Sequence, residues 1–268
     1  MEEKMKIGFI GCGNMGSALA TAISQNMQNK LYIFDTNTEK MNSIAKALGA
    51  ETMDAKKIAE CVDILFLAVK PNIISAALLP LCDVIAKNPA LTVVSMAAGV
   101  RIDTLSAILP VGTPIIRIMP NTPVSVGCGM TAYATNEYVS AEREEAFLSA
   151  MKSTGELDRL SEQLIDAESA IAGSGPAFAY MFVDALADGG VLSGLPRDKA
   201  ILYAAKMLEG AAKLLLTSGE HPGALKDKVC SPGGSTIEGV MALEQGAFRA
   251  AVSEAVAATC EKAKKLGG

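Results

Sequence analysis

The fold is decided by one stretch, Ile7-Gly8-Phe9-Ile10-Gly11-Cys12-Gly13-Asn14-Met15-Gly16, which carries the spacing G-x-G-x-x-G between a strand-like run and an amphipathic one. Gly11 permits a tight turn, Gly13 lets the backbone approach a pyrophosphate, and Gly16 allows a helix to pack closely on the strand. The first amides of that helix then point at the negative charge. We interpret residues 11–16 as the phosphate-binding turn of a dinucleotide site; the alternative is a glycine-rich turn of another α/β fold.

Short apolar runs alternate with amphipathic stretches through the rest of the first half. The apolar runs are continuous, which is typical of a parallel sheet covered on both faces. We therefore expect a Rossmann-type, doubly wound α/β domain over residues 1–160. The spacing of Thr36 and Glu39 predicts a capping box for its second helix. Strands are predicted at residues 6–10, 31–34, 63–68, 92–96, 114–119 and 129–134, and helices at residues 15–25, 38–48, 73–86, 101–108 and 140–154.

The second half, residues 161–268, shows helical patterns broken by Gly and Pro, and no strand pattern beyond residue 164. It is expected to form an all-α domain. Residues 176–192 are apolar nearly all round, and such a helix must be buried on every side. Because about a hundred residues leave little room for that within one chain, we infer that two chains interleave here, so that this half is a dimerisation domain.

Composition and charge exclude several classes of protein. Of the 268 residues, 50% are hydrophobic and 20% charged, which excludes a disordered chain. The net charge of −5 argues against a general nucleic-acid binder. The first six residues hold no signal-peptide core, and no apolar stretch approaches the roughly 18–20 residues that span a bilayer. The six cysteines lack disulfide or metal-site spacing, so we expect a reduced, cytoplasmic protein with no bound metal and no membrane partner.

Asp35 follows the second predicted strand, where a carboxylate typically accepts the ribose hydroxyls of NAD and repels the 2′-phosphate of NADP. The alternative is that Asp35 caps the following helix. Thr36, Asn37 and Lys40 could still hold a phosphate if the Asp35 carboxylate turns away. The cofactor is therefore expected to be NADH or NADPH, with Asp35 favouring NADH.

A second anion site is predicted in the helical half, at Ser231-Pro232-Gly233-Gly234-Ser235-Thr236-Ile237-Glu238. Ser235 and Glu238 have capping-box spacing, so a helix is expected to begin at Thr236. The two glycines leave the first amides of that helix uncovered, and a small carboxylate could bind there without Arg or Lys. The Thr236 hydroxyl would then lie beside the ligand. The alternative is an ordinary Pro-Gly turn before a well-capped helix.

The sequence offers little for hydrolytic chemistry. Its single histidine, His221, precedes Pro222 in a polar turn and is expected to be solvated. The chain has no second histidine and no nucleophile elbow. Hydride transfer requires neither, because the cofactor carries the reactive group and the protein positions it.

Further motifs follow the glycine turn in a set order. In the first half they are Ala68-Val69-Lys70-Pro71, Val94-Ser95-Met96-Ala97-Ala98-Gly99 and Arg117-Ile118-Met119-Pro120-Asn121-Thr122-Pro123. In the second half they are Gly173-Ser174-Gly175-Pro176-Ala177-Phe178 and the run from Val229 to Glu238. With residues 10–15, these motifs resemble the pyrroline-5-carboxylate reductase family over essentially the whole chain. The resemblance implies reduction of 1-pyrroline-5-carboxylate to L-proline by NAD(P)H, the last step of proline synthesis, in an interleaved homodimer that often assembles further.

The resemblance also implies roles for single residues. Glu162 matches a carboxylate near the ammonium of the product; the alternative is an acid favoured by a helix dipole. Thr236 would be the catalytic residue, bonding the ring nitrogen or ordering a water that does. The substrate carboxylate would lie on the amides of Gly234, Ser235 and Thr236, in the turn that contains Ser231 and Gly233. The nicotinamide would lie near Ala68, Val69, Lys70 and Pro71, near Met96, Ala97 and Ala98, and near residues 119–122, which include Asn121.

Three departures from the family pattern concern the cofactor. Members that prefer NADPH often carry Asn-Arg where this chain has Asp35-Thr36, and many carry Asn where Ala55 aligns. Lys228 stands where Asn is usual and could contact a cofactor phosphate. These differences leave the NADH/NADPH preference open.

Two other functions compete with this interpretation. A 3-hydroxyacid dehydrogenase of similar layout would use a lysine on the first long helix of the second domain, and residues 176–192 contain none. A dinucleotide-sensing or scaffold protein would bind the cofactor without substrate-dependent oxidation.

Overall fold

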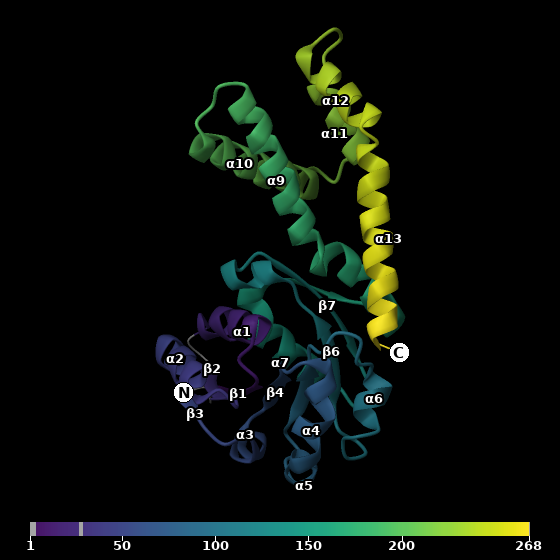
Figure 1. The fold of residues 1–268 in the computed structure, drawn as a ribbon. Helices are drawn as coiled ribbons and strands as arrows, with labels where there is room; N and C mark the ends of the chain where they lie inside the picture. The colour runs from purple at the N-terminus through teal and green to yellow at the C-terminus, as the bar shows by residue number, and fades with distance from the viewer. Residues whose placement is uncertain (1–3, 27–28, 268) are drawn as a thin grey trace. The chain divides into compact units, whose positions relative to one another are not determined.

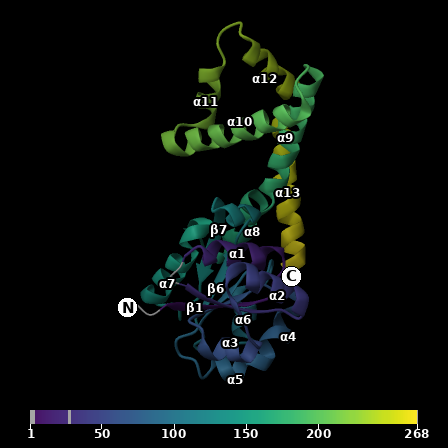
Figure 2. The same cartoon turned by 90° about the vertical axis from the view of Figure 1, so that its left-hand side faces the viewer.

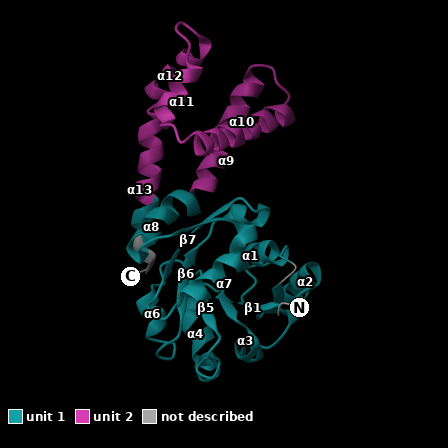
Figure 3. Ribbon diagram, turned by 180° about the vertical axis from the view of Figure 1, so that it is seen from behind, with its two compact units in different colours: residues 1–174, 259–268 teal, residues 175–258 magenta. Residues whose placement is uncertain are grey.

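A computed structural model describes residues 4–26 and 29–267; the first three residues of the charged N-terminal segment lie outside the described residues. The chain divides into two compact units (Figure 3). Unit 1 comprises Met1–Ser174 with Thr259–Gly268, and unit 2 comprises Gly175–Ala258. Secondary structure changes from mixed to helical after strand β8 (Gly155–Arg159), close to the predicted boundary at residue 160, whereas unit 1 continues to Ser174.

Unit 1 is built on an eight-stranded sheet with the strand order β3-β2-β1-β4-β5-β6-β7-β8. Neighbouring strands run parallel except β6 and β7, which pair antiparallel. Strand order reverses between β1 and β4, which is where open α/β sheets bind ligands. The strands are β1 Met5–Ile10, β2 Asn29–Phe34, β3 Glu51–Thr52, β4 Ile64–Leu67, β5 Thr92–Ser95, β6 Ile115–Met119, β7 Gly129–Thr135 and β8 Gly155–Arg159.

Helices cover both faces of this sheet (Figures 1 and 2). Successive strand residues feed two separate cores: Ile64 and Phe66 join the core under α1 and α7, and Leu65 and Leu67 join the one under α3, α4 and α6. Apolar residues on both faces explain the continuous apolar runs in the sequence. The helices are α1 Asn14–Ser24, α2 Thr38–Leu48, α3 Ala55–Cys61, α4 Ile74–Leu78, α5 Cys82–Ile85, α6 Ile102–Ser106, α7 Ala141–Met151 and α8 Ile165–Glu168.

The structure of unit 1 departs from the sequence predictions in five places. Strands β3 and β8 and helix α3 were not predicted; β3 is only two residues long and exposed. The single helix expected at residues 73–86 is divided into α4 and α5 by a 3₁₀ turn, Leu79–Leu81, whose proline cannot donate a helical hydrogen bond. The capping box from Thr36 to Glu39 is wrong: Asn37 caps α2, and its side chain accepts from the Lys40 amide.

Unit 2 is helical throughout. Helix α9 is apolar, but many of its side chains are exposed to solvent: Met181 is 73% exposed and Tyr180 is 66% exposed. The predicted burial of this helix on every side is therefore not achieved within one chain. An apolar groove of about 580 Å³ is lined by α9, α12 and α13 residues, including Phe178, Phe182 and Phe248. The helices are α9 Gly175–Leu192, α10 Arg197–Ser218, α11 Pro222–Val229, α12 Ser235–Gln245 and α13 Phe248–Gly267, of which the part from Thr259 onward belongs to unit 1.

Residues 162–192 form a helical run that is long and apolar enough to cross a membrane, contrary to the expectation from the sequence. It contains α8, a π-helix at Ser169–Gly173, and α9. Only 11% of its most apolar window is buried in one chain. Length and apolarity alone do not separate a bilayer span from a helix covered by a protein partner.

Candidate active site

The glycine turn forms an open cradle at the N-terminus of α1. Gly11 has a φ of 100°, and a Cβ there would lie 2.6 Å from the Ala68 carbonyl oxygen. A Cβ on Gly16 would lie 2.6 Å from the Gly11 carbonyl oxygen, so both positions require glycine. Gly13 differs, because the nearest atom to its Cβ would be 3.9 Å away. No side chain caps α1, so the first amides of this helix have no side-chain acceptor, as at helix N-termini that bind anions.

Asp35 lies beside this turn, and its carboxylate is engaged by backbone amides. Oδ2 accepts from the Cys12 amide at 2.5 Å, and Oδ1 accepts from the Asn37 amide at 2.8 Å. The alternative that Asp35 caps α2 is wrong, because Asn37 does so. Burial, and then the Asp35 charge, raise the pKa of the Cys12 thiol to about 11, so it stays protonated at neutral pH. Thr36, Asn37 and Lys40 are exposed at the rim.

The three segments that the family resemblance assigns to the nicotinamide follow β4, β5 and β6. Because these strands are parallel, the segments share one edge of the sheet with the glycine turn. The Ala68 amide donates to the Ile10 carbonyl at 2.8 Å, and the Met96 amide donates to the Leu67 carbonyl at 3.3 Å. Val69 is half-buried, and Lys70 and Pro71 are exposed at the start of a 3₁₀ turn.

Asn121, after β6, is buried and uses both ends of its amide. Nδ2 donates to the Ala172 carbonyl at 3.0 Å, and Oδ1 accepts from the Met130 amide at 3.0 Å. The residue therefore ties the segment after β6 to β7 and to the π-helix. These contacts make Asn121 a support for this segment.

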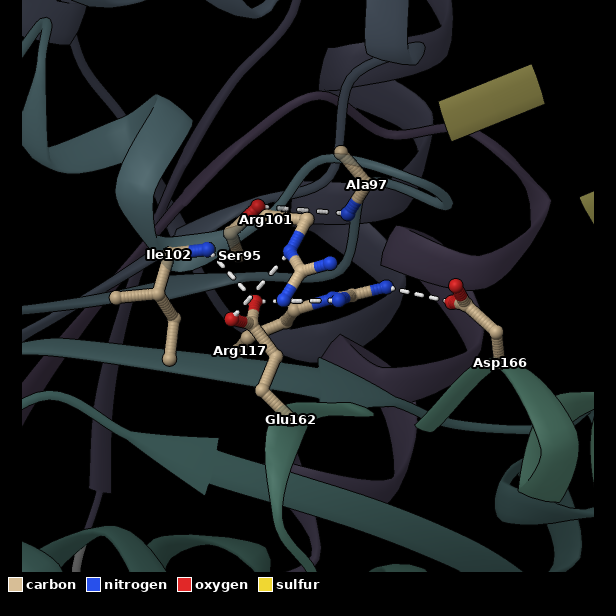
Figure 4. Close-up of polar contacts among 7 residues, drawn as sticks. All are labelled: Ser95, Ala97, Arg101, Ile102, Arg117, Glu162 and Asp166. Atoms are coloured by element: carbon tan, nitrogen blue, oxygen red, sulfur yellow. Dashed lines mark hydrogen bonds and ion pairs between the residues drawn. The ribbon is translucent and has the colours of Figure 1, made fainter. Parts of the chain in front are cut away.

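Glu162 belongs to an ion-pair cluster around the buried Arg117 (Figure 4). Its Oε1 accepts from Arg117 Nη1 at 3.1 Å and from the Ile102 amide at 2.7 Å. Arg117 also donates through Nη2 to Asp166 Oδ1 at 2.9 Å. Arg101 Nε lies 3.8 Å from Glu162 Oε2. Arg117 belongs to one of the family motifs, but neither Arg117 nor Asp166 was predicted as a site residue. The contacts of Glu162 differ from the substrate-binding role that the resemblance implies for it.

Glu168, also missed, ends α8 with both carboxyl oxygens buried and without a hydrogen-bond partner among the described residues. Burial, and secondarily the Asp158 charge, raise its pKa from 4.5 to about 7. A buried carboxyl group without partners ionises only at a higher pH than usual, since desolvation penalises the charged form. The burial of Glu168 could not be predicted from the sequence, because it is one of several polar residues before the apolar helix.

Replacing Glu168 with Gln is expected to remove a pH dependence of stability. With a folded pKa of about 7 against 4.5 unfolded, the folded protein keeps this proton after the unfolded chain has lost it. The contribution to the free energy of unfolding is therefore greatest below pH 4.5 and is lost as pH rises through 7. At about pH 8 the variant should be more stable than the parent by about 1–2 kcal/mol, allowing for solvent screening.

Urea denaturation at acidic and basic pH measures this difference, which should shrink towards about pH 5. Glu156→Gln, on the exposed strand β8, is the matched control. A stability difference between parent and Glu168→Gln that stays constant with pH would contradict the raised pKa.

The predicted substrate turn lies entirely in unit 2. The Gly234 amide donates to the Ser231 carbonyl at 3.0 Å, and Gly233 has a φ of 68°, as expected when Pro and Gly occupy the centre of a type II turn. The helix α12 begins at Ser235, one residue earlier than predicted. The Ser235–Glu238 capping box is therefore wrong: Gly234 is the N-cap, and no side chain caps the helix. The amides of Ser235 and Thr236 begin the helix at an exposed surface.

Two residues near this turn make contacts that were not predicted. His221 is the N-cap of α11, and its Nδ1 accepts from the Gly223 amide at 3.1 Å. Lys228 Nζ donates to both carboxyl oxygens of Glu220, at 2.7 and 2.6 Å. The Lys228 ammonium thus has a partner within unit 2, and a role at a cofactor phosphate remains a prediction. Within the described ranges, no cluster of three His, Cys, Asp or Glu side chains could hold a metal ion.

Comparison with known proteins covers both halves of the chain. A family model described as pyrroline-5-carboxylate reductase dimerisation matches residues 162–266. A model described as NADP oxidoreductase, coenzyme F420-dependent, matches residues 6–99. The pyrroline-5-carboxylate reductase of Escherichia coli (strain K12) is 42% identical, with 97% of this chain and 98% of that protein covered.

Solved structures give the same result. The pyrroline carboxylate reductase of Plasmodium falciparum with NADP bound is 31% identical, with a TM-score of 0.88 and 99% of each chain covered. The pyrroline-5-carboxylate reductase of Coxiella burnetii is 30% identical, with a TM-score of 0.90 and 99% of each chain covered. The similarity therefore extends through both units.

Proposed function

This chain belongs to the pyrroline-5-carboxylate reductase family, and from that premise we propose which of its residues carry the reaction. The enzyme catalyses the NAD(P)H-dependent reduction of 1-pyrroline-5-carboxylate to proline. The observation that carries this conclusion is 42% identity over nearly the full length of a curated reductase. The open cradle at Gly13 supports it independently, because a dinucleotide requires such a space.

The cofactor is held by the glycine turn. Residues 11–16 bind the pyrophosphate through backbone amides, and the segments after β4, β5 and β6 receive the nicotinamide. When bound, the nicotinamide supplies the hydride that reduces the C=N bond. The assignment of these segments is supported by their common edge of the sheet. In the relative from Plasmodium falciparum the bound cofactor is NADP.

The preference of this chain is for NADH. Asp35 supports this, because its carboxylate would repel a 2′-phosphate. Asp35→Ala is expected to raise the ratio of kcat/KM with NADPH to kcat/KM with NADH by about tenfold, the effect of removing one like charge near the surface. Initial rates with both cofactors measure the ratio. Asp35→Asn is the control that keeps an acceptor for the Cys12 amide, and an unchanged ratio in both variants would mean that Asp35 only holds the turn.

The substrate carboxylate binds the turn at Ser231, Gly233 and Gly234 and the first amides of α12. Its negative charge is favoured by the N-terminus of a helix of eleven residues with no side-chain cap. Thr236 bonds the ring nitrogen or orders a water that does. This arrangement suits the reaction, since a protonated imine is the better electrophile and the nitrogen becomes more basic as its carbon is reduced.

The enzyme is a homo-oligomer, as its match to a dimerisation family indicates. The finer proposal is an interleaved homodimer through unit 2. Exposed apolar residues of α9 support it, because a large uncovered apolar surface requires a partner. A protein partner also accounts for the apolar run at residues 162–192 without a membrane. A cytoplasmic location remains a prediction, for which the free cysteines are the supporting observation.

The paired cofactor assay tests the reaction directly. Purified protein, 1-pyrroline-5-carboxylate and either NADH or NADPH should lose absorbance at 340 nm, with proline formed in equal amount. Cofactor binding without substrate-dependent oxidation would instead support the sensing or scaffold alternative. No loss of absorbance with either cofactor would refute the assignment.

A further inference from the structure

The loop that joins β5 to α6, residues 96–101, is fastened at both ends. At its start the Ala97 amide donates to Ser95 Oγ at 3.4 Å. At its end the Ile102 amide, the first of α6, donates to Glu162 Oε1 at 2.7 Å. Arg101 is the N-cap of α6 and offers no side-chain cap. The Glu162 carboxylate, distant in sequence, therefore caps this short helix in place of a local residue.

Arg117 determines where the Glu162 carboxylate lies. Its side chain is only 2% exposed, and it reaches Glu162 and Asp166 through different nitrogens (Figure 4). A guanidinium held by two carboxylates has one orientation, whereas a single exposed ion pair has many. Arg117 also stands directly across from Ser95 in the β5–β6 register. Ser95 therefore holds the start of the loop, and its cross-strand partner Arg117 holds the end of the loop through Glu162.

The cluster carries no net charge, and its effect is to orient the groups that it joins. Its two arginines, Arg101 and Arg117, balance its two carboxylates, Glu162 and Asp166. A buried ion pair contributes little stability that well-packed apolar side chains could not supply. The ion pair does fix the orientation of its side chains, because each hydrogen bond has a defined donor and acceptor. Here it fixes the position of the end of loop 96–101.

We propose that Glu162, held by Arg117, is a positioning residue for hydride transfer. It fixes loop 96–101 and so orients the nicotinamide ring, which the proposed function assigns to Met96, Ala97 and Ala98; the inference rests on that assignment. Displacing a reacting ring by about 1 Å can cost a hundredfold in rate. The role differs from that of a substrate ligand, which would act on the binding of 1-pyrroline-5-carboxylate.

Steady-state kinetics of three variants separate these roles. Glu162→Ala removes the acceptor for the Ile102 amide and should lower kcat by about ten- to a hundredfold, with KM for 1-pyrroline-5-carboxylate changed less than about twofold. Glu162→Gln keeps an acceptor oxygen and should recover most of the lost kcat. Glu156→Gln, on the exposed strand β8 and outside the cluster, should keep kcat near that of the parent. A raised KM with kcat intact in Glu162→Ala, or an equal loss of kcat in Glu156→Gln, would overturn the proposal.

Binding measurements test the same inference without turnover. Calorimetry with NADH and with ADP-ribose gives the part of the affinity that the nicotinamide adds. In Glu162→Ala this part should fall by about tenfold, while the affinity for ADP-ribose, which binds the glycine turn, is retained. A parallel loss of both affinities would mean general destabilisation and contradict a positioning role. Failure of the proposed function is seen separately, as a parent enzyme that binds NADH and forms no proline.

Discussion

Thr236→Ala should lower kcat/KM for 1-pyrroline-5-carboxylate by about ten- to a thousandfold, the range for one polar contact made in the transition state. The Thr236 hydroxyl lies in the first turn of α12 and can both donate to and accept from a ring nitrogen or its water. The effect should fall mainly on kcat, because the carboxylate of the substrate is held by backbone amides that the substitution leaves in place.

Two variants make this result specific. Thr236→Ser keeps a hydroxyl and should retain most of the activity. Thr217→Ala, on an exposed face of α10, removes a threonine hydroxyl that donates to the Lys213 carbonyl, and its rate should match the parent. Full activity in Thr236→Ala, with a folded protein, would show that the proton reaches the imine by another route.

The second large effect is expected at Gly13, where adding a methyl group should weaken cofactor binding by about tenfold or more without harming the fold. A Cβ at this position meets nothing closer than the Ala68 carbonyl oxygen at 3.9 Å, so the free protein tolerates it. The same methyl group would project into the space in front of the α1 amides, where the pyrophosphate must approach.

Gly16→Ala and Gly210→Ala are the two controls for this prediction. At Gly16 the new Cβ would lie 2.6 Å from the Gly11 carbonyl oxygen, so the melting temperature should fall together with cofactor affinity. At Gly210, on α10, nothing lies within 4 Å, and cofactor affinity should be unchanged. Fluorescence titration with NADH and thermal denaturation measure the two properties. If Gly13→Ala bound NADH as tightly as the parent, the turn would not hold the pyrophosphate.

Most strands of unit 1 could be predicted from local patterns of apolar residues in the sequence. Continuous apolar runs identified β1, β2, β4, β5, β6 and β7 because each strand is buried on both faces. Strand β8 escaped this test, since Glu156, Asp158 and Arg159 on it are exposed. Helix starts were less readable: both predicted capping boxes were wrong, because Asn37 and Gly234 lie one residue from the predicted caps, and a cap depends on the φ and ψ of one residue.

The dinucleotide fold and the glycine turn could be predicted from the sequence, since both depend on residue types at fixed short spacings. The family and its reaction were expected from the resemblance carried by the ordered motifs. Only the tertiary structure revealed the Arg117–Glu162 cluster and the raised pKa of Glu168. The cluster depends on residues far apart in the chain meeting, as when the buried Arg117 on β6 reaches Glu162 and Asp166, and the pKa of Glu168 depends on burial. Burial and long-range pairing change what a charged side chain does, and neither is encoded in the spacing of its neighbours.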